Sequence, residues 1–206
     1  MSIRNIIFDY GNVIANIPQE TVQKTFSDLG ISNETLLLHH DKIRHLMHDF
    51  IDGIRPLDDV LYDIQTYCAE GTTLKKIKDT VTVLQGEIPE IRLHHIVALK
   101  KKYKIYLLSN INEVIWENCE IRFGELGYKT SDLFDAIFLS CRIGIAKPDE
   151  RIYKKMLQET GMIPEESVFL DDRVDNCEAA RALGIQASWV KPNEVESNEV
   201  YKRLIQ

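Results

Sequence analysis

Hydrophobic residues along this chain fall into short continuous runs, separated by longer segments with helical spacing. The first run, Ile6 to Phe8, ends at Asp9, and Gly11 and Asn12 follow closely. A short apolar run without alternation is typical of a strand that is buried on both faces, as in a parallel sheet. We therefore expect the chain to begin with such a strand. It would place the Asp9 carboxylate at the carboxyl edge of the sheet, where open α/β sheets bind ligands.

Four further apolar runs predict the remaining strands of the sheet, at residues 105–108, 136–139, 168–170 and 185–190. Segments of helical character lie around them, at residues 89–99, 113–126, 150–160, 177–183 and 199–205, and residues 140–147 are expected to form a loop. Strands that alternate with helices predict an α/β fold with a doubly wound parallel sheet of Rossmann-like type. Trp116 and Trp189 are expected to pack in its core.

Residues 17–85 show helical spacing and no convincing strand pattern. Gly30, Gly53 and Gly71 mark the expected breaks between helices over 20–29, 33–50 (one or two), 56–68 and 72–84. We predict a catalytic core of residues 1–16 and 86–206, with residues 17–85 inserted as an all-helical cap. A cap over the catalytic edge excludes water and selects the substrate.

The composition places the chain among ordinary globular proteins. It has 206 residues, of which 44% are hydrophobic and 28% charged, and a formal net charge of -7. An acidic balance gives no footprint for nucleic acid or for an anionic membrane, so we expect neither as a partner. The four cysteines are dispersed and form no CxxC pair, which is typical of reduced thiols in a cytosolic protein. The apolar run near the N-terminus is too short for a signal peptide or a membrane span. We therefore expect a cytoplasmic protein. Monomer and homodimer remain open.

Four sets of polar residues lie at strand ends or in the loops that follow: Asp9, Ser109–Asn110, Lys147 and Asp171–Asp172. Because the carboxyl ends of parallel strands meet at one edge of a sheet, these distant residues can converge. Their convergence requires the first and fourth strands to lie side by side.

This set can support phosphoryl transfer. Asp9 is the candidate nucleophile, which attacks phosphorus and forms an aspartyl-phosphate that water then hydrolyses. Asp9 with Asp171 or Asp172 can bind a hard divalent cation, most plausibly Mg²⁺, and Lys147 can stabilise the phosphorylated carboxylate. The candidates for holding the phosphate oxygens, by side chain or backbone N–H, are Ser109, Asn110, Gly11 and Asn12.

The segments that carry these residues are IIFDYGNVI, YLLSN, GIAKPDERIY and VFLDDRVDN. Their content and order resemble the haloacid dehalogenase-like hydrolase superfamily. The layout with a small helical cap resembles bacterial sugar phosphatases of the glucose-1-phosphatase type and the amino-terminal domain of mammalian epoxide hydrolases. The resemblance covers nearly the whole chain and is weakest in residues 17–85.

The resemblance implies a Mg²⁺-dependent phosphatase that acts on a small phosphorylated metabolite, with a sugar phosphate as one candidate. When the roles are carried over by position, the resemblance implies Asp9 as the nucleophile, Ser109 as a phosphate ligand and Lys147 as the lysine of the third motif. It also implies Asp172 as a direct metal ligand with Asp171 nearby, and the Gly11 carbonyl as a further ligand.

One departure from the family pattern concerns Gly11. Many phosphatases of this family carry at this position a second Asp that acts as general acid and base. General acid catalysis typically contributes ~10²–10⁴ in rate, so poor leaving groups should suffer most from its loss. We therefore expect substrates with relatively acidic leaving groups, such as anomeric sugar phosphates, acyl phosphates or aryl phosphates.

Three alternatives remain open. A carbon–halogen hydrolase of the same superfamily would not require Mg²⁺, and the late acid pair Asp171–Asp172 argues against it. A module that binds phosphate or a partner without catalysis is suggested by Gly11. A receiver-type signalling domain also combines Asp, Ser or Thr, Lys and Mg²⁺, but its acid pair comes early in the chain and it lacks a cap.

Overall fold

The computed structural model describes residues 2–206 and contains a parallel five-stranded sheet in the order β3-β2-β1-β4-β5. Its strands are β1 (Asn5–Phe8), β2 (Lys104–Ser109), β3 (Ala136–Leu139), β4 (Ser167–Asp171) and β5 (Gln186–Trp189). The predicted doubly wound parallel α/β sheet is therefore confirmed. The first strand is central, and it pairs with β4 as the convergence of the polar residues requires.

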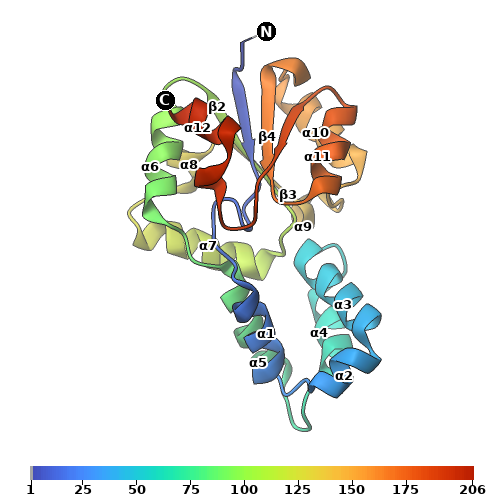
Figure 1. The fold of residues 1–206 in the computed structure, drawn as a ribbon. Helices are drawn as coiled ribbons and strands as arrows, with labels where there is room; N and C mark the ends of the chain where they lie inside the picture. Colours follow the sequence, from blue (N-terminus) through green and yellow to red (C-terminus); the bar gives the residue numbers. More distant parts are fainter. Residues whose placement is uncertain (1) are drawn as a thin grey trace.

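The apolar run of β1 is continuous because both faces of the sheet are covered (Figure 1). Ile6 and Phe8 point into a cluster with helices α6 (Glu90–Leu99), α7 (Glu113–Glu125) and α12 (Glu199–Ile205). Ile7 points the opposite way, into a second cluster with α10 (Glu150–Thr160) and α11 (Val174–Ala182). Burial of each of these side chains stabilises the fold by about 1.5–3 kcal/mol.

Short elements account for most differences from the expected pattern. The predicted loop 140–147 begins with a single helical turn, α9 (Ser140–Ile143), and α8 (Thr130–Leu133) was not expected. One turn is too short to show a hydrophobic period, so the sequence pattern misses such elements. Helix α11 starts at Val174, three residues earlier than expected. The 3₁₀ turns η2 (Pro164–Glu166) and η3 (Val195–Ser197) precede β4 and α12.

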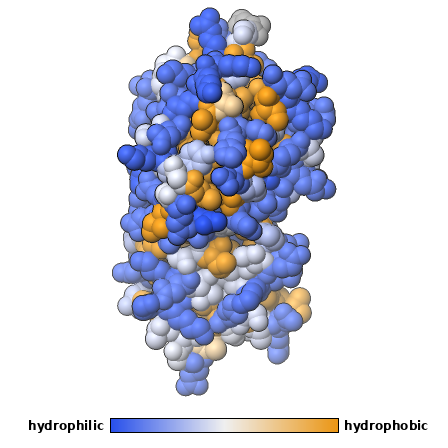
Figure 2. All heavy atoms as spheres, turned by 90° about the vertical axis from the view of Figure 1, so that its left-hand side faces the viewer, coloured by the Kyte–Doolittle hydropathy of each residue, from blue (hydrophilic) through white to orange (hydrophobic). Residues whose placement is uncertain are grey.

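The inserted segment is helical, as expected, and we keep the name cap for residues 17–85. It contains α1 (Gln19–Asp28), α2 (Asn33–Leu38), α3 (His40–Asp52), α4 (Leu57–Gln65), α5 (Leu74–Val81) and the 3₁₀ turn η1 (Thr82–Gln85). In Figure 1 these helices lie below the carboxyl edge of the sheet. Figure 2 shows that the outer face of the cap on this side is mainly hydrophilic. Among residues 2–206 we find no helix with both the length and the hydropathy of a membrane span.

The two linkers of the cap run side by side. Asn16 and Glu87 form an antiparallel bridge with N–H···O distances of 2.8 and 3.0 Å. Gly86 follows the last turn of the cap with φ of 76°, and a Cβ atom there would lie 2.6 Å from the Asn16 carbonyl oxygen. Only glycine fits this close approach of the linkers.

A buried arginine on α6 holds the segment that follows β1. Arg92 is 3% exposed, and its Nη1 donates to the carbonyl oxygens of Val13 and Ile14 at 3.0 and 3.2 Å. Its Nη2 donates to the Asn193 carbonyl at 3.1 Å, and Glu196 accepts from Nε at 2.6 Å. The planar guanidinium thus ties the loop after β1 to the loop after β5.

We predict that Arg92→Met lowers the free energy of unfolding by about 3 kcal/mol, because it leaves the buried Val13 and Ile14 carbonyls without donors. Urea unfolding measures the change. Arg203→Met, at an exposed position of α12, is the control and should change stability by less than about 0.5 kcal/mol. An equal change in the free energy of unfolding for the two variants would contradict the proposed role of Arg92 in holding the two loops together.

Candidate active site

The sheet register fixes the position of Asp9. Phe8, the last residue of β1, pairs with Leu107 on one side and Leu170 on the other. The Asp9 N–H then donates to the Leu170 carbonyl at 2.9 Å, which continues the ladder by one residue. Asp9 therefore leaves the sheet beside Asp171, the last residue of β4.

A buried lysine connects these two carboxylates. Lys147 Nζ donates to Asp9 Oδ1 at 2.8 Å, to Asp171 Oδ2 at 2.7 Å and to the Leu108 carbonyl at 2.8 Å. All three N–H donors of the ammonium are thereby used. Burial alone would lower the pKa of Lys147, but Asp171 and Asp9 raise its pKa overall, so the side chain stays charged.

Asp171 is fully buried and its two oxygens are saturated by the protein. Besides Lys147, it accepts from the Arg173 backbone N–H at 2.8 Å and from Asn176 Nδ2 at 3.0 and 3.1 Å. The structure therefore places Asp171 behind the site, where it holds Lys147.

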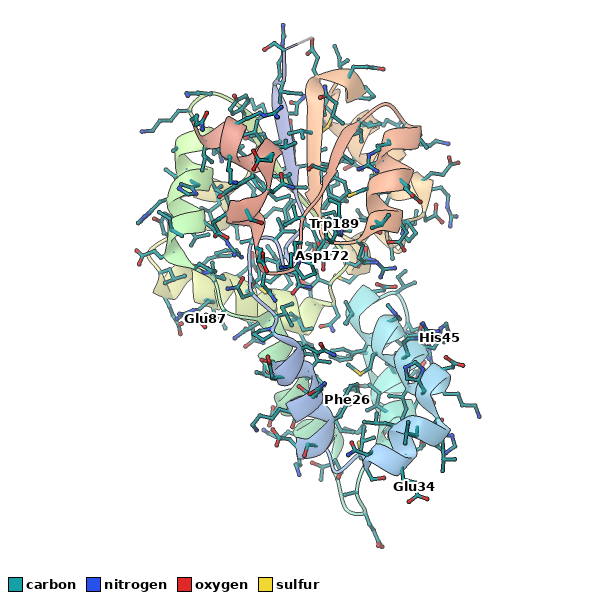
Figure 3. All side chains as sticks on the ribbon, viewed as in Figure 1. Phe26, Glu34, His45, Glu87, Asp172 and Trp189 are labelled. Carbon is teal, nitrogen blue, oxygen red and sulfur yellow. The ribbon has the colours of Figure 1, made fainter. Side chains whose placement is uncertain are left out.

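Asp172 is the member of the acid pair that lines the cavity. Its Oδ2 accepts from Asn12 Nδ2 at 2.8 Å, and its carbonyl oxygen accepts from Trp189 Nε1 at 2.8 Å (Figure 3). The expectation that Trp189 packs in the core was wrong, because the ring is 46% exposed while its N–H holds the backbone at Asp172. Trp116 is buried as expected.

The three carboxylates of Asp9, Asp171 and Asp172 offer oxygens that all lie within 4.8 Å of one another. Burial raises the pKa of Asp9 to about 7; Lys147 opposes this shift, and the two other carboxylates add to it. Burial, and then the neighbouring Asp171, also raise the pKa of Asp172, so one ammonium does not suffice to hold all three carboxylates ionised. A hard divalent cation such as Mg²⁺ fits a donor set of this kind. The buried Asn12 Oδ1, which has no hydrogen-bond partner among residues 2–206, is a further oxygen beside Asp172.

Ser109 and Asn110 stand at the end of β2. Ser109 is buried at the cavity wall. The Asn110 amide is fully engaged: Oδ1 accepts from the Lys147 N–H at 2.8 Å, and Nδ2 donates to the Lys147 carbonyl at 2.9 Å and to Asp52 Oδ1 at 3.0 Å. The Asn110 side chain is thus a brace, and any contact of this residue with phosphate falls to its backbone N–H.

Gly11 and Asn12 form the turn after Asp9, and both line the cavity. Asn12 adopts φ of 59°, a left-handed conformation that asparagine tolerates better than most residues. A Cβ atom on Gly11 would lie 3.3 Å from Ile17 Cδ1, the flexible end of a side chain. The turn therefore presents no acidic side chain at Gly11.

The sequence pattern missed one residue of the site, Asp52, which reaches it from the end of α3. Its carboxylate accepts from Asn110, its carbonyl accepts from Ser140 Oγ at 2.6 Å, and burial raises its pKa. Asn112 Nδ2 also donates to the Phe50 carbonyl at 2.8 Å. These bonds dock the end of α3 on the core, and no local signal in the sequence indicates such long-range contacts.

Comparison with known proteins supports this picture. Residues 3–184 match the haloacid dehalogenase-like hydrolase family. The chain is 28% identical over 186 residues to D-ribitol-5-phosphate phosphatase of Bacteroides thetaiotaomicron, which covers 89% of this chain and 90% of that protein. It is 41% identical over 69 residues to bifunctional epoxide hydrolase 2 of Sus scrofa, which covers 34% of this chain and 12% of that protein.

A solved structure shares the architecture. The haloacid dehalogenase family enzyme of Bacteroides thetaiotaomicron in complex with magnesium and inorganic phosphate superposes with a TM-score of 0.82 and 27% identity. The superposition covers 95% of this chain and 98% of that chain. With the family match extending over most of the sequence and the fold shared along almost its entire length, this chain belongs to the haloacid dehalogenase-like hydrolase family.

Proposed function

We propose that this hydrolase is a Mg²⁺-dependent phosphatase that cleaves a small phosphomonoester through an aspartyl-phosphate on Asp9. The observation that carries the proposal is the buried Asp9–Lys147–Asp171 set beside Asp172, at the end of a cavity of about 490 Å³. The related solved enzyme with bound magnesium and phosphate, and the related ribitol phosphate phosphatase, support it.

In the first step, a carboxylate oxygen of Asp9 attacks phosphorus, the bond to the leaving oxygen breaks, and that oxygen departs with the electron pair. Lys147 holds Asp9 Oδ1 at 2.8 Å and offsets part of the charge at the phosphorylated carboxylate. Ser109 and the backbone N–H groups of Gly11, Asn12 and Asn110 are the proposed ligands of the phosphate oxygens.

A bound Mg²⁺, held by Asp9, Asp172 and the Gly11 carbonyl, would neutralise the charge that otherwise keeps a phosphate away from these carboxylates. Asp171 supports this arrangement through Lys147. In the second step, water attacks phosphorus, the Asp9 carboxylate leaves as the product phosphate forms, and the site is restored. The same residues would not need a cation for carbon–halogen hydrolysis, so the excess of carboxylates over ammonium groups favours the phosphatase.

We predict that Asp9→Asn lowers kcat by about 10⁴-fold or more, because the amide cannot form the covalent intermediate. Phosphate release from p-nitrophenyl phosphate with Mg²⁺ measures the loss, and circular dichroism verifies that the fold is retained. Glu178→Gln, at an exposed position of α11, is the control and should keep full activity. Turnover of the Asp9 variant at the parental rate would refute the assigned nucleophile.

We predict that Asp172→Asn stabilises the metal-free protein by about 1 kcal/mol, because it removes one of three mutually repelling carboxylates. The same variant should lose the rise in Tm that excess Mg²⁺ produces in the parent protein. Calorimetric melting with EDTA or Mg²⁺ measures both effects, and Glu178→Gln, at an exposed position of α11 outside the cluster, is the control. EDTA should also abolish turnover of the parent; turnover that survives EDTA would favour the carbon–halogen alternative.

The turn at Gly11 gives a prediction about leaving groups. Phenyl phosphate should be hydrolysed at least about 10²-fold faster than benzyl phosphate, because phenol is the more acidic leaving group and no side chain at Gly11 donates a proton. Gly11→Asp should narrow this ratio by raising the rate for benzyl phosphate, since Ile17 Cδ1 can move aside for the new side chain. Steady-state kcat/KM values with both esters measure the ratio, because this constant reports the step in which the leaving group departs. A benzyl ester that equals the phenyl ester in the parent would show that another group supplies the proton.

A further inference from the structure

The catalytic edge opens into a cavity that continues into the cap. Its cap wall is made by apolar side chains of α1, α2, α3 and η1, among them Phe26, Leu36, Ile43, Met47, Ile51 and Leu84. In Figure 3 Phe26 lies in the space between α1 and α3. The cavity thus has a charged end at Asp9 and an apolar body within the cap.

Helix α3 contributes two stripes to this wall. Ile43, Met47 and Ile51 repeat every four residues and are buried or half-buried. A parallel polar stripe, His40, Arg44 and His48, also lines the cavity, but these three residues are exposed to solvent. The polar stripe therefore forms the solvent side of the cavity, and the apolar stripe forms its interior.

The apolar side chains of the cap are directed inward, where they pack against the hydrophobic core and also line the cavity. A cavity of about 490 Å³ lies in the range of pockets that bind small ligands. Some apolar residues of the cap, such as Leu37 and Leu38, are exposed on its surface, whereas those that line the cavity are buried or half-buried.

The chemistry of the wall discriminates between classes of leaving group. A sugar or polyol carries a hydroxyl on nearly every carbon, and each hydroxyl that enters an apolar wall without a partner loses its hydrogen bonds to water. A hydrocarbon group instead binds more tightly, with an affinity that rises about fourfold for each methylene that it buries.

We propose that the cap cavity binds the leaving group of the substrate, and that this group is a hydrocarbon. The substrate is then an apolar aryl or alkyl phosphomonoester, and sugar and polyol phosphates are poor substrates. This inference rests on the proposed phosphatase function only for the position of the phosphoryl group, at Asp9.

A series of 4-alkylphenyl phosphates tests this proposal, because the acidity of the phenol stays nearly constant while the chain grows. With Mg²⁺ present, kcat/KM should rise about fourfold per methylene from the methyl to the butyl compound, mainly through KM. The ester with a 3-hydroxypropyl chain matches the butyl compound in length and should be at least about tenfold poorer. A flat series, or a preference for the hydroxylated chain or for glucose 1-phosphate, would overturn the proposal.

Two variants locate the effect in the cap. Leu36→Gln and Met47→Gln place an amide on the cavity wall and should flatten the dependence of kcat/KM on chain length. Leu37→Gln is the matched control, since Leu37 neighbours Leu36 on α2 but is 82% exposed and lies outside the wall. The control should keep the parental slope. The same slope in all three variants would place the hydrocarbon elsewhere and refute the proposal.

A binding experiment separates this inference from the proposed function. The affinities of the matching 4-alkylphenylphosphonates, which cannot be hydrolysed, are measured by calorimetry with Mg²⁺ present. Affinity that rises about fourfold per methylene without turnover of any ester supports the apolar site and refutes the phosphatase. If the phenyl esters are turned over but affinity does not depend on chain length, the phosphatase is supported and the apolar site is refuted.

Discussion

The structure depends on the confinement of three carboxylates around one ammonium at the edge of the sheet. The register between β1 and β4 leaves Asp9 and Asp171 no freedom to separate, and Lys147 is the only cation bonded to both within the described residues. The apolar strands therefore hold three carboxylates beside one ammonium, and burial together with the neighbouring carboxylates raises the pKa of Asp9 to about 7. A site of this kind is prepared for a cation and an anionic ligand before either arrives.

The sheet and most of the candidate site could be predicted from the sequence because their signals are local. An apolar run that ends in a polar residue defines both a buried strand and a group at its carboxyl end, as at Phe8–Asp9 and Leu170–Asp171. The residues alone did not predict which of the two adjacent acids faces the cavity, and only the family resemblance pointed to Asp172. That choice depends on the partners of Asp171, namely Lys147, Asn176 and the backbone at Arg173, and these contacts arise only in the folded chain.

The cap shows the same limit more clearly. The spacing of apolar residues predicted its helices, but each helix has one apolar stripe that can either meet a neighbouring helix or face an open space. Only the packing of α1 and α3 shows that Phe26 and Met47 line a cavity. Asn110 bonds to both Asp52 and Lys147 and so connects the end of α3 with the core. These contacts likewise exist only when the cap is docked.

The bridge between Asn16 and Glu87 has a consequence for how the chain folds. The central pairing of β1 with β2 joins Asn5 to Lys104, so it must close a loop that includes the entire insert. The entropy of closing a loop grows with its length, and contacts between residues distant in sequence slow folding. Once the local contacts of the helices bring Asn16 next to Glu87, the insert no longer adds to the effective length of the loop. Only the two short segments that flank it remain to be ordered. The insertion of a large helical segment into the first crossover thus adds little to the kinetic barrier of the sheet.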